Sequence, residues 1–143
     1  MYAKMFPDLF FLILDERKNT FMRTTFVLIC ADANAADFAL SKSLGLMGAD
    51  IILSPSAWAV PPDHDNVADP YGSLWISAYR PISKIFNLWF VGVSNVGVLS
   101  DGAWTGLDCI GSSLAIDRDG NTVVQGPYGA DADTIIYIDV KVK

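Results

Sequence analysis

The feature that most constrains the fold is a pair of uninterrupted apolar runs with a helical segment between them. The first, TTFVLIC (24–30), is β-branched and aromatic without polar alternation, which is typical of a strand covered on both faces. The second is ADIILSP (49–55). Between them Asn34 suits a helix N-cap, apolar residues recur at helical spacing, and Gly48 ends the helix. Residues 24–55 therefore predict two neighbouring strands of one sheet, with functional residues at the strand ends.

The rest of the chain continues this alternation. We expect a polar loop (56–68), a helix begun by Asp69 and Pro70, a third apolar strand (88–97), a hairpin that turns at Asp119 and Gly120, and a closing strand (134–140). Pro81 should end or kink the helix near Tyr79, because a proline inside a helix removes a hydrogen bond. No repeat or linker interrupts the sequence, so we expect one α/β domain over residues 1–143.

Composition narrows the possible partners and location. The 143 residues are 52% hydrophobic and 18% charged, which suits one compact domain with a buried core. A net charge of −6 argues against nucleic-acid and anionic membrane partners, since phosphate recognition needs a basic surface. Two cysteines make no disulfide framework, so a reducing cytoplasm is the expected location. The apolar run FFLIL (10–14) is too short to span a bilayer and is interpreted as core or strand.

Cys30 is the first candidate for chemistry, because it lies where an apolar strand gives way to a turn of small residues. Backbone amides at such a turn can stabilise a thiolate and an oxyanion. On position alone, a buried structural cysteine is the more frequent case. The surrounding sequence favours the nucleophile instead.

The stretch from Ile29 to Trp58, ICADANAADFALSKSLGLMGADIILSPSAW, resembles the nucleophile region of the nitrilase superfamily of carbon–nitrogen hydrolases. In that family an Ile-Cys-x-Asp segment precedes a helix, a Gly-Ala-Asp turn, an apolar strand and Pro-Ser-Ala-Trp. The likeness continues through VGVSNVG (91–97) and IGSSLAIDRDG (110–120) to the strand after GPYGADADT, and covers roughly residues 24–140. It implies an α-β-β-α sandwich, here incomplete at the N-terminus.

The resemblance also implies an activity, the hydrolysis of a non-peptide carbon–nitrogen bond in a small amide or nitrile through a cysteine thioester, without a cofactor or metal. Cys30 would be the nucleophile, and the backbone N–H of Ala31 would stabilise the oxyanion. YAKMFPD (2–8) resembles the family's Tyr-x-Lys-x-His-Leu-Pro stretch, which makes Lys4 the candidate catalytic lysine although Phe6 replaces the histidine. A solvated lysine is the alternative interpretation.

Two side chains are candidates for substrate binding. Trp58 would line a pocket, as Trp104 and Tyr128 also could, although aromatic residues in apolar segments are more often packing residues. Asn95 follows a strand as the family's asparagine does and would orient the loop there. Amide, nitrile and carbamoyl substrates are not distinguished, because selectivity depends on the shape of the pocket.

The sequence departs from the family at the general base, a glutamate that should lie well upstream of the lysine. If the chain begins at Met1, this base is absent, which typically removes about 10²- to 10⁴-fold of the rate. Glu16 fits either a second family glutamate or a solvated turn. The alternative function is a catalytically inactive, truncated homologue that acts, if at all, as a binding or interaction protein.

Three further expectations follow. In YRPISK (79–84) only Arg80 matches the family's usual helix sequence, which puts that helix and its subunit contacts in doubt. Missing N-terminal strands would expose apolar sheet faces, so we expect poor stability or a homo-oligomer. His64 is the only histidine available for a metal site or for a thiol hydrolase of another fold, and Cys109 is interpreted as structural.

Overall fold

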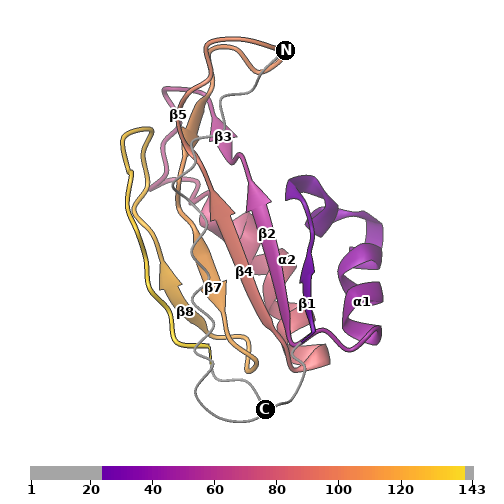
Figure 1. Ribbon diagram of the computed structural model, residues 1–143. Helices are drawn as coiled ribbons and strands as arrows, with labels where there is room; N and C mark the ends of the chain where they lie inside the picture. The colour runs from indigo at the N-terminus through magenta and orange to yellow at the C-terminus, as the bar shows by residue number, and fades with distance from the viewer. Residues whose placement is uncertain (1–23, 141–143) are drawn as a thin grey trace.

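The computed structural model describes residues 24–140. Helices cover one face of a sheet, so the predicted α/β class is confirmed (Figure 1). The elements are β1 (Thr25–Val27), the 3-10 turns η1 (Cys30–Asn34) and η2 (Ala36–Phe38), α1 (Ala39–Leu46), β2 (Ile51–Ser56), β3 (Ala59–Val60), α2 (Gly72–Phe86), β4 (Trp89–Ser94), β5 (Val96–Val98), β6 (Asp108–Ile110), β7 (Leu114–Ile116) and β8 (Thr122–Gln125). No helix within residues 24–140 is long and apolar enough to cross a membrane.

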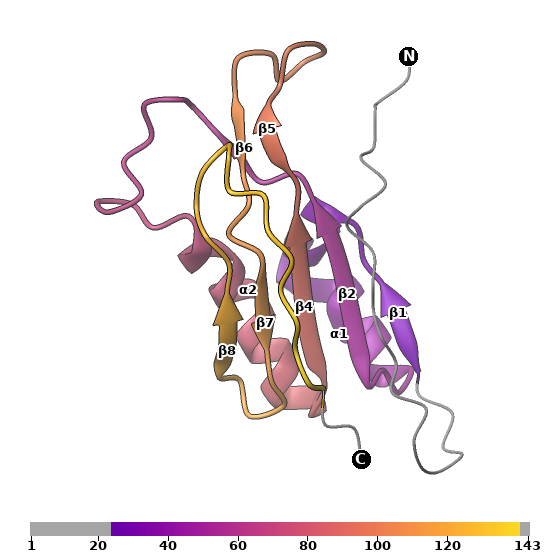
Figure 2. The same cartoon turned by 60° about the vertical axis from the view of Figure 1, so that its left-hand side comes forward.

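The main sheet has the strand order β1-β2-β4-β7-β8. The first three strands are parallel to one another, and β7 and β8 are antiparallel additions. The parallel pairing of β1 with β2 confirms the strand, helix, strand unit predicted for residues 24–55. Because the parallel strands run in one direction, their carboxyl ends meet at one edge of the sheet, where β2 and β4 lead into the small sheet β3-β6-β5 (Figures 1 and 2).

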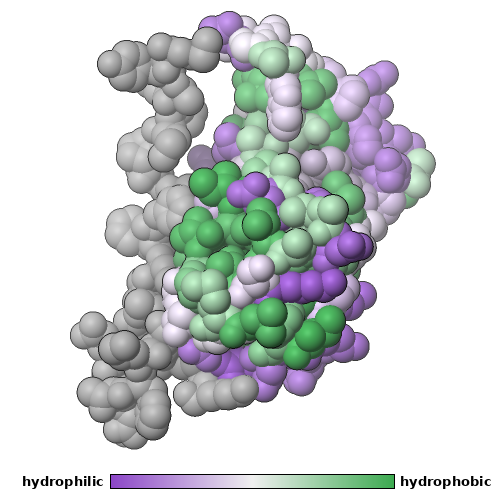
Figure 3. All heavy atoms as spheres, turned by 90° about the vertical axis from the view of Figure 1, so that its right-hand side faces the viewer, coloured by the Kyte–Doolittle hydropathy of each residue, from purple (hydrophilic) through white to green (hydrophobic). Residues whose placement is uncertain are grey.

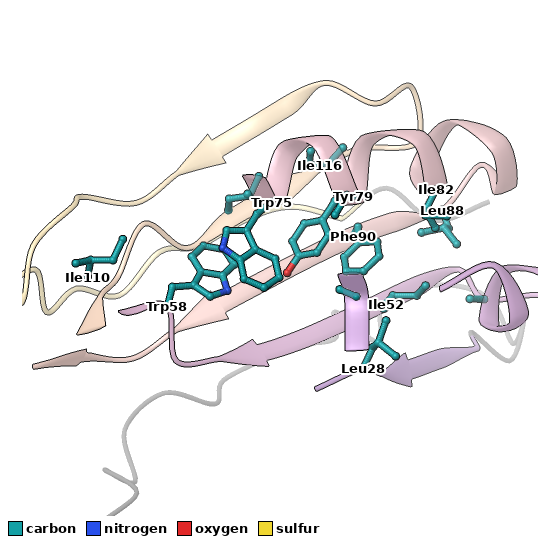
Figure 4. Close-up of a cluster of buried hydrophobic side chains, with 14 of the residues drawn as sticks. Leu28, Ile52, Trp58, Trp75, Tyr79, Ile82, Leu88, Phe90, Ile110 and Ile116 are labelled. Carbon is teal, nitrogen blue, oxygen red and sulfur yellow. The ribbon is translucent and has the colours of Figure 1, made fainter. Parts of the chain in front are cut away.

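One face of the main sheet forms the core with the helices. A row of register partners crosses the strands on this face: Phe26, Ile52, Phe90 and Ile116. Trp75, Tyr79 and Ile82 project from α2 onto the row, and all three are buried (Figure 4). Burial of this apolar surface is the main driving force for packing α2 against the sheet.

The second face of the main sheet is also apolar. Its register row runs through Val27, Leu53, Val91, Ala115 and Val124. Part of the chain after β8 runs along this face and lines an apolar groove together with β2, β4 and β7 (Figure 2). The sheet therefore has two apolar faces, and helices cover only one of them.

The beginning of the structure differs from the prediction in two respects. The predicted strand 24–30 is only three residues long and lies at the sheet edge, where Val27 is exposed rather than covered on both faces. Asn34 does not cap a helix, because Asp37 and Phe38 adopt left-handed backbone conformations that break the segment into 3-10 turns. The α-helix itself begins at Ala39.

The prediction that Pro81 ends the second helix is wrong. Helix α2 continues through Pro81 to Phe86, and Asn87 ends it in a left-handed conformation. Because proline has no backbone N–H, the carbonyl of Ser77, four residues earlier, lacks its helical hydrogen bond. Ser77 is exposed on the outer surface of α2. Water can solvate that carbonyl, so the helix tolerates the proline.

The end of the chain also differs from the prediction. The hairpin is confirmed, since β7 pairs with β8 and the Gly120 N–H donates to the Asp117 carbonyl at 3.0 Å. Residues 134–140, predicted as a closing strand, pair with no strand of the described chain. A strand needs a hydrogen-bonded partner as well as a suitable sequence, and these residues have no such partner within 24–140.

Candidate active site

Cys30 lies immediately past β1, at the edge where the parallel strands end. The Leu28 N–H donates to the Leu53 carbonyl at 2.8 Å, so the parallel ladder continues one residue beyond β1. The Asp32 N–H donates to the Ile29 carbonyl at 3.0 Å and closes the turn around Cys30. In this turn the Cys30 side chain is half-buried.

The backbone of Cys30 is strained. Its φ of 45° lies in the left-handed region, which non-glycine residues rarely adopt. Residues held in such conformations cluster at active sites, where the surrounding structure fixes them. The geometry is therefore that of a thiol presented on a sharp turn between a strand and a helical segment, as the sequence predicted.

Beside Cys30, η1 packs against β2 and α2. Buried aromatic rings from α2, from β4 and from the segment after β2 stack on one another (Figure 4). Trp58 stacks on Trp75 with 4.6 Å between ring centroids, and Tyr79 stacks on Phe90 at 3.9 Å. This stack fills the space between α2 and the sheet with apolar surface.

The ends of β2 and β4 are joined by serine hydroxyls and backbone groups. The Trp58 N–H donates to the Ser94 hydroxyl at 3.0 Å, and the Ser94 N–H donates to the Ser113 hydroxyl at 3.0 Å. The Asn95 N–H donates to the Ser56 carbonyl at 3.1 Å, and the Asn95 carbonyl accepts from Gly111 at 3.2 Å. These bonds fix the loops that surround the carboxyl edge of the sheet.

Burial shapes the electrostatics of this region. It raises the pKa of Tyr79 well above its usual value, against an opposing contribution from the neighbouring Ser54 hydroxyl. Burial also raises the pKa of Tyr71, to which the Cys30 and Cys109 thiolates contribute. The pKa of the Cys109 thiol is raised by burial first, and then by Asp108 and Cys30. Both tyrosines are therefore neutral at neutral pH.

The predicted site residues fall in different places. Cys30 and Ala31 share η1, and Ala31 is exposed. Trp58 is 0% exposed, which fits the packing role, and its role in substrate binding stays a prediction. Asn95 lies exposed between β4 and β5. Lys4 lies outside the described residues.

Two further sequence candidates, Cys109 and His64, lie within residues 24–140. Glu16 and the apolar run 10–14 also lie outside the described residues. Cys109 is buried, as expected of a structural cysteine. His64 packs near the rings of Tyr71 and Tyr128, and one of its ring nitrogens lies 3.0 Å from the Asp69 carbonyl oxygen. In the part of the chain that the structure describes, no three histidine, cysteine or acidic side chains come together to hold a metal ion.

Tyr79 and Ser54 were missed by sequence reasoning. Tyr79 occupies an apolar helix position, where tyrosine and phenylalanine are equivalent in pattern. Ser54 lies within an apolar strand and carries no motif. Only the strand register and the helix packing bring Tyr79 close to Gly92, the register partner of Ser54.

Comparison with known proteins identifies the fold. A carbon–nitrogen hydrolase from Helicobacter pylori aligns with a TM-score of 0.60 and 22% identity, over 72% of this chain and 36% of that chain. A nitrilase-superfamily protein of Saccharomyces cerevisiae aligns with a TM-score of 0.52 and 21% identity, over 73% and 34%. A nitrilase-superfamily amidase from Nesterenkonia, solved as a variant, aligns with a TM-score of 0.53 and 19% identity, over 75% and 36%.

These likenesses show that the chain has the nitrilase-type fold, as predicted. The alignments span about a third of the length of each of these solved chains. Another structure of the Nesterenkonia amidase contains acrylamide joined to that protein's active-site cysteine. No protein-family model matches the sequence, and no curated protein matches it.

Proposed function

We propose that this chain belongs to the carbon–nitrogen hydrolases and uses Cys30 to hydrolyse a small amide or nitrile. One observation carries the proposal: the strained, half-buried Cys30 on the turn after β1, in a fold shared with carbon–nitrogen hydrolases and an amidase. A structural cysteine gains nothing from a left-handed backbone conformation, whereas a nucleophile gains exposure at the strand end.

For an amide substrate the Cys30 thiolate attacks the carbonyl carbon. The carbon–nitrogen bond of the tetrahedral intermediate breaks, the nitrogen takes up a proton, and ammonia leaves a thioester on Cys30. Water then attacks the thioester, which releases the carboxylic acid and regenerates the thiol. In this proposal the Ala31 N–H and the Lys4 ammonium stabilise the oxyanion in both steps.

The proposed reaction also needs a general base. Glu16 is the only glutamate in the sequence, and residues 24–140 contain none. Because a positioned base contributes about 10²- to 10⁴-fold to the rate, turnover by this chain should be slow unless a carboxylate reaches Cys30. Detection of the acyl-enzyme is therefore a more sensitive readout than steady-state turnover.

The test measures ammonia release from a panel of simple amides and nitriles, and intact mass for a thioester. We expect the wild-type chain to gain the mass of one acyl group and to release ammonia, and Cys30→Ser to lose both. Cys109→Ala is the matched control, because it removes the chain's other cysteine from a buried position on β6. It should keep the acyl adduct.

Lys4→Ala tests the oxyanion role, with the exposed Lys42 of α1 changed to alanine as the control. Loss of acylation in the Lys4 variant alone would support the role of Lys4. If neither wild type nor Cys30→Ser forms an adduct or releases ammonia with any compound, the hydrolase proposal fails. The alternative, an inactive homologue that binds a partner, would then be favoured.

A further inference from the structure

The segment after β8 ends in residues that have the character of a strand but no neighbouring strand. Residues 134–140, TIIYIDV, run along the second face of the main sheet without a turn or bend (Figure 2). All of them except Asp139 are β-branched or aromatic, the residue types that favour strands. Their N–H and carbonyl groups form no hydrogen bond with any other group of residues 24–140.

Alternating side chains hold this segment on its own sheet. Ile136 and Ile138 are half-buried and line the apolar groove together with β2, β4 and β7. Ile135 and Tyr137, which alternate with them, are 68% and 77% exposed. In an extended chain the backbone N–H and carbonyl groups point sideways, between the two rows of side chains. The segment is therefore anchored by one row, and its backbone remains available to a partner strand.

The composition of the segment does not protect this backbone. Exposed strand edges in native proteins are usually blocked by lysine, proline or a bulge, because unpaired backbone groups are a template for pairing with another chain. Residues 134–140 contain no lysine, proline or glycine. An unblocked, apolar, extended segment of this kind points to pairing with a further strand.

The charges at the two ends of the segment indicate which strand fits. Asp131 and Asp133 precede it, whereas Lys141 and Lys143, which lie outside the described residues, follow it in the sequence. A second copy in the opposite direction brings the acidic end of one segment to the basic end of the other. A parallel copy would bring like charges together, which is destabilising. The segment is thus complementary to itself in the antiparallel direction.

We propose that residues 134–140 pair antiparallel with the same residues of a second copy of this chain, with Tyr137 opposite Tyr137 on the two-fold axis. In this register Ile135 lies opposite Asp139 of the partner copy. Only this register pairs all seven residues, and an axis at Ile136 would place Asp133 opposite Asp139. The proposal does not depend on Cys30 and goes beyond the proposed function.

The strength of this contact follows from its size. Stable interfaces bury about 1,200–2,000 Å² in total, more than two strands of seven residues supply. The cost of ordering the segment is small, however, because Ile136 and Ile138 already hold it on the sheet. We therefore expect a weak dimer that forms as the concentration rises, and a covalent cross-link to trap it.

A disulfide trap tests the register. In Tyr137→Cys the two introduced thiols lie opposite each other, with Cβ atoms about 4.5–5.5 Å apart, a separation from which a disulfide can form. Ile135→Cys is the matched control on the same exposed row. Its two thiols are four positions apart along the paired strands, about 13 Å, which is too far for a disulfide.

Both cysteine variants are oxidised with diamide and followed on non-reducing gels. We expect Tyr137→Cys to form a covalent dimer at least about tenfold faster than Ile135→Cys, because only its thiols are within reach. Wild type reports links through Cys30 and Cys109, and peptide mass spectrometry identifies the link between the introduced thiols. Equal rates for the two variants, or faster linking of Ile135→Cys, would overturn the proposal.

A charge exchange tests the pairing without a cross-link. Tyr137→Lys places two ammonium groups opposite each other and should weaken the dimer about tenfold, whereas Ile135→Lys places one beside Asp139 of the partner copy and should keep it. Both positions are exposed, and both changes alter the net charge of −6 equally. Sedimentation velocity measures the association, and circular dichroism checks that the variants are folded. Equal weakening by the two lysines, or a wild type that stays monomeric and unlinked, would refute the pairing.

Discussion

At the scale of single residues, sequence reasoning located the nucleophile candidate but not its surroundings. Cys30 could be found because the end of an apolar run before a turn of small residues is visible in the sequence, and the structure places it on such a turn. The close approach of Tyr79 to Gly92 could not be found. It depends on folding, since Gly92 is 38 positions after Ser54 in the sequence and is adjacent to it only through strand pairing.

Gly92 offers a test of the aromatic stack at the scale of one residue. Gly92→Ala would place a Cβ atom 2.7 Å from a Tyr79 ring carbon and 3.0 Å from a Trp58 ring carbon, so both rings must shift. Overpacking of this kind typically lowers the free energy of unfolding by about 1–3 kcal/mol. Urea denaturation followed by far-UV circular dichroism measures the loss.

Gly48→Ala is a useful comparison for Gly92→Ala. Gly48 has a φ of +85° with no other atoms within 4 Å of an added Cβ, so alanine there tests backbone strain alone, at about 1 kcal/mol. If Gly92→Ala is as stable as wild type, the stack is looser than the structure indicates, and the position of the Tyr79 hydroxyl is not fixed by packing.

At the scale of elements, the sequence predicted the parts that depend on local pattern. The strand, helix, strand unit and the hairpin at Gly120 follow from apolar periodicity and turn residues, and both are confirmed. The errors concern tertiary context. Pro81 stays within α2 because the unpaired carbonyl faces solvent, and residues 134–140 form no strand because strand formation depends on a partner that local sequence does not reveal.

Strand β2 allows the two faces of the sheet to be compared within one element. Ile52 is 0% exposed on the helix-covered face, and the adjacent Leu53 is half-buried on the other face. We expect Ile52→Ala to lower the free energy of unfolding by about 2–4 kcal/mol, because it leaves a cavity in the packed core. Leu53→Ala should cost about 1 kcal/mol or less, because less apolar surface is lost from a half-open face.

Urea denaturation of the two alanine variants at low protein concentration checks this difference. The slope of the free energy against urea concentration should be unchanged in both variants. Equal losses for Ile52→Ala and Leu53→Ala would mean that the second face of the sheet is as well covered in solution as the face beneath α2.

At the scale of the whole molecule, the main sheet is apolar on two faces and covered by helices on one. Apolar side chains also gather on the outside of β1 and α1, where Val27, Ile29, Leu46 and Met47 are exposed (Figure 3). The groove on the second face is lined mainly by apolar residues of β2, β4, β7 and the segment after β8. Contiguous exposed apolar surface of this kind typically marks an interaction site.

We therefore expect the chain to self-associate through the second face and its edge at β1. Sedimentation velocity over a range of concentrations should show a mean mass that rises with concentration.

Val27→Asp places a charge at the exposed end of the apolar row, where Val27 is 59% exposed, and should shift the distribution towards monomer. Val67→Asp makes the same chemical change at a 91% exposed loop position away from this face, so it controls for the added repulsion in a chain whose net charge is already −6. A cooperatively folding monomer at every concentration, or equal effects of the two aspartates, would contradict association through this face.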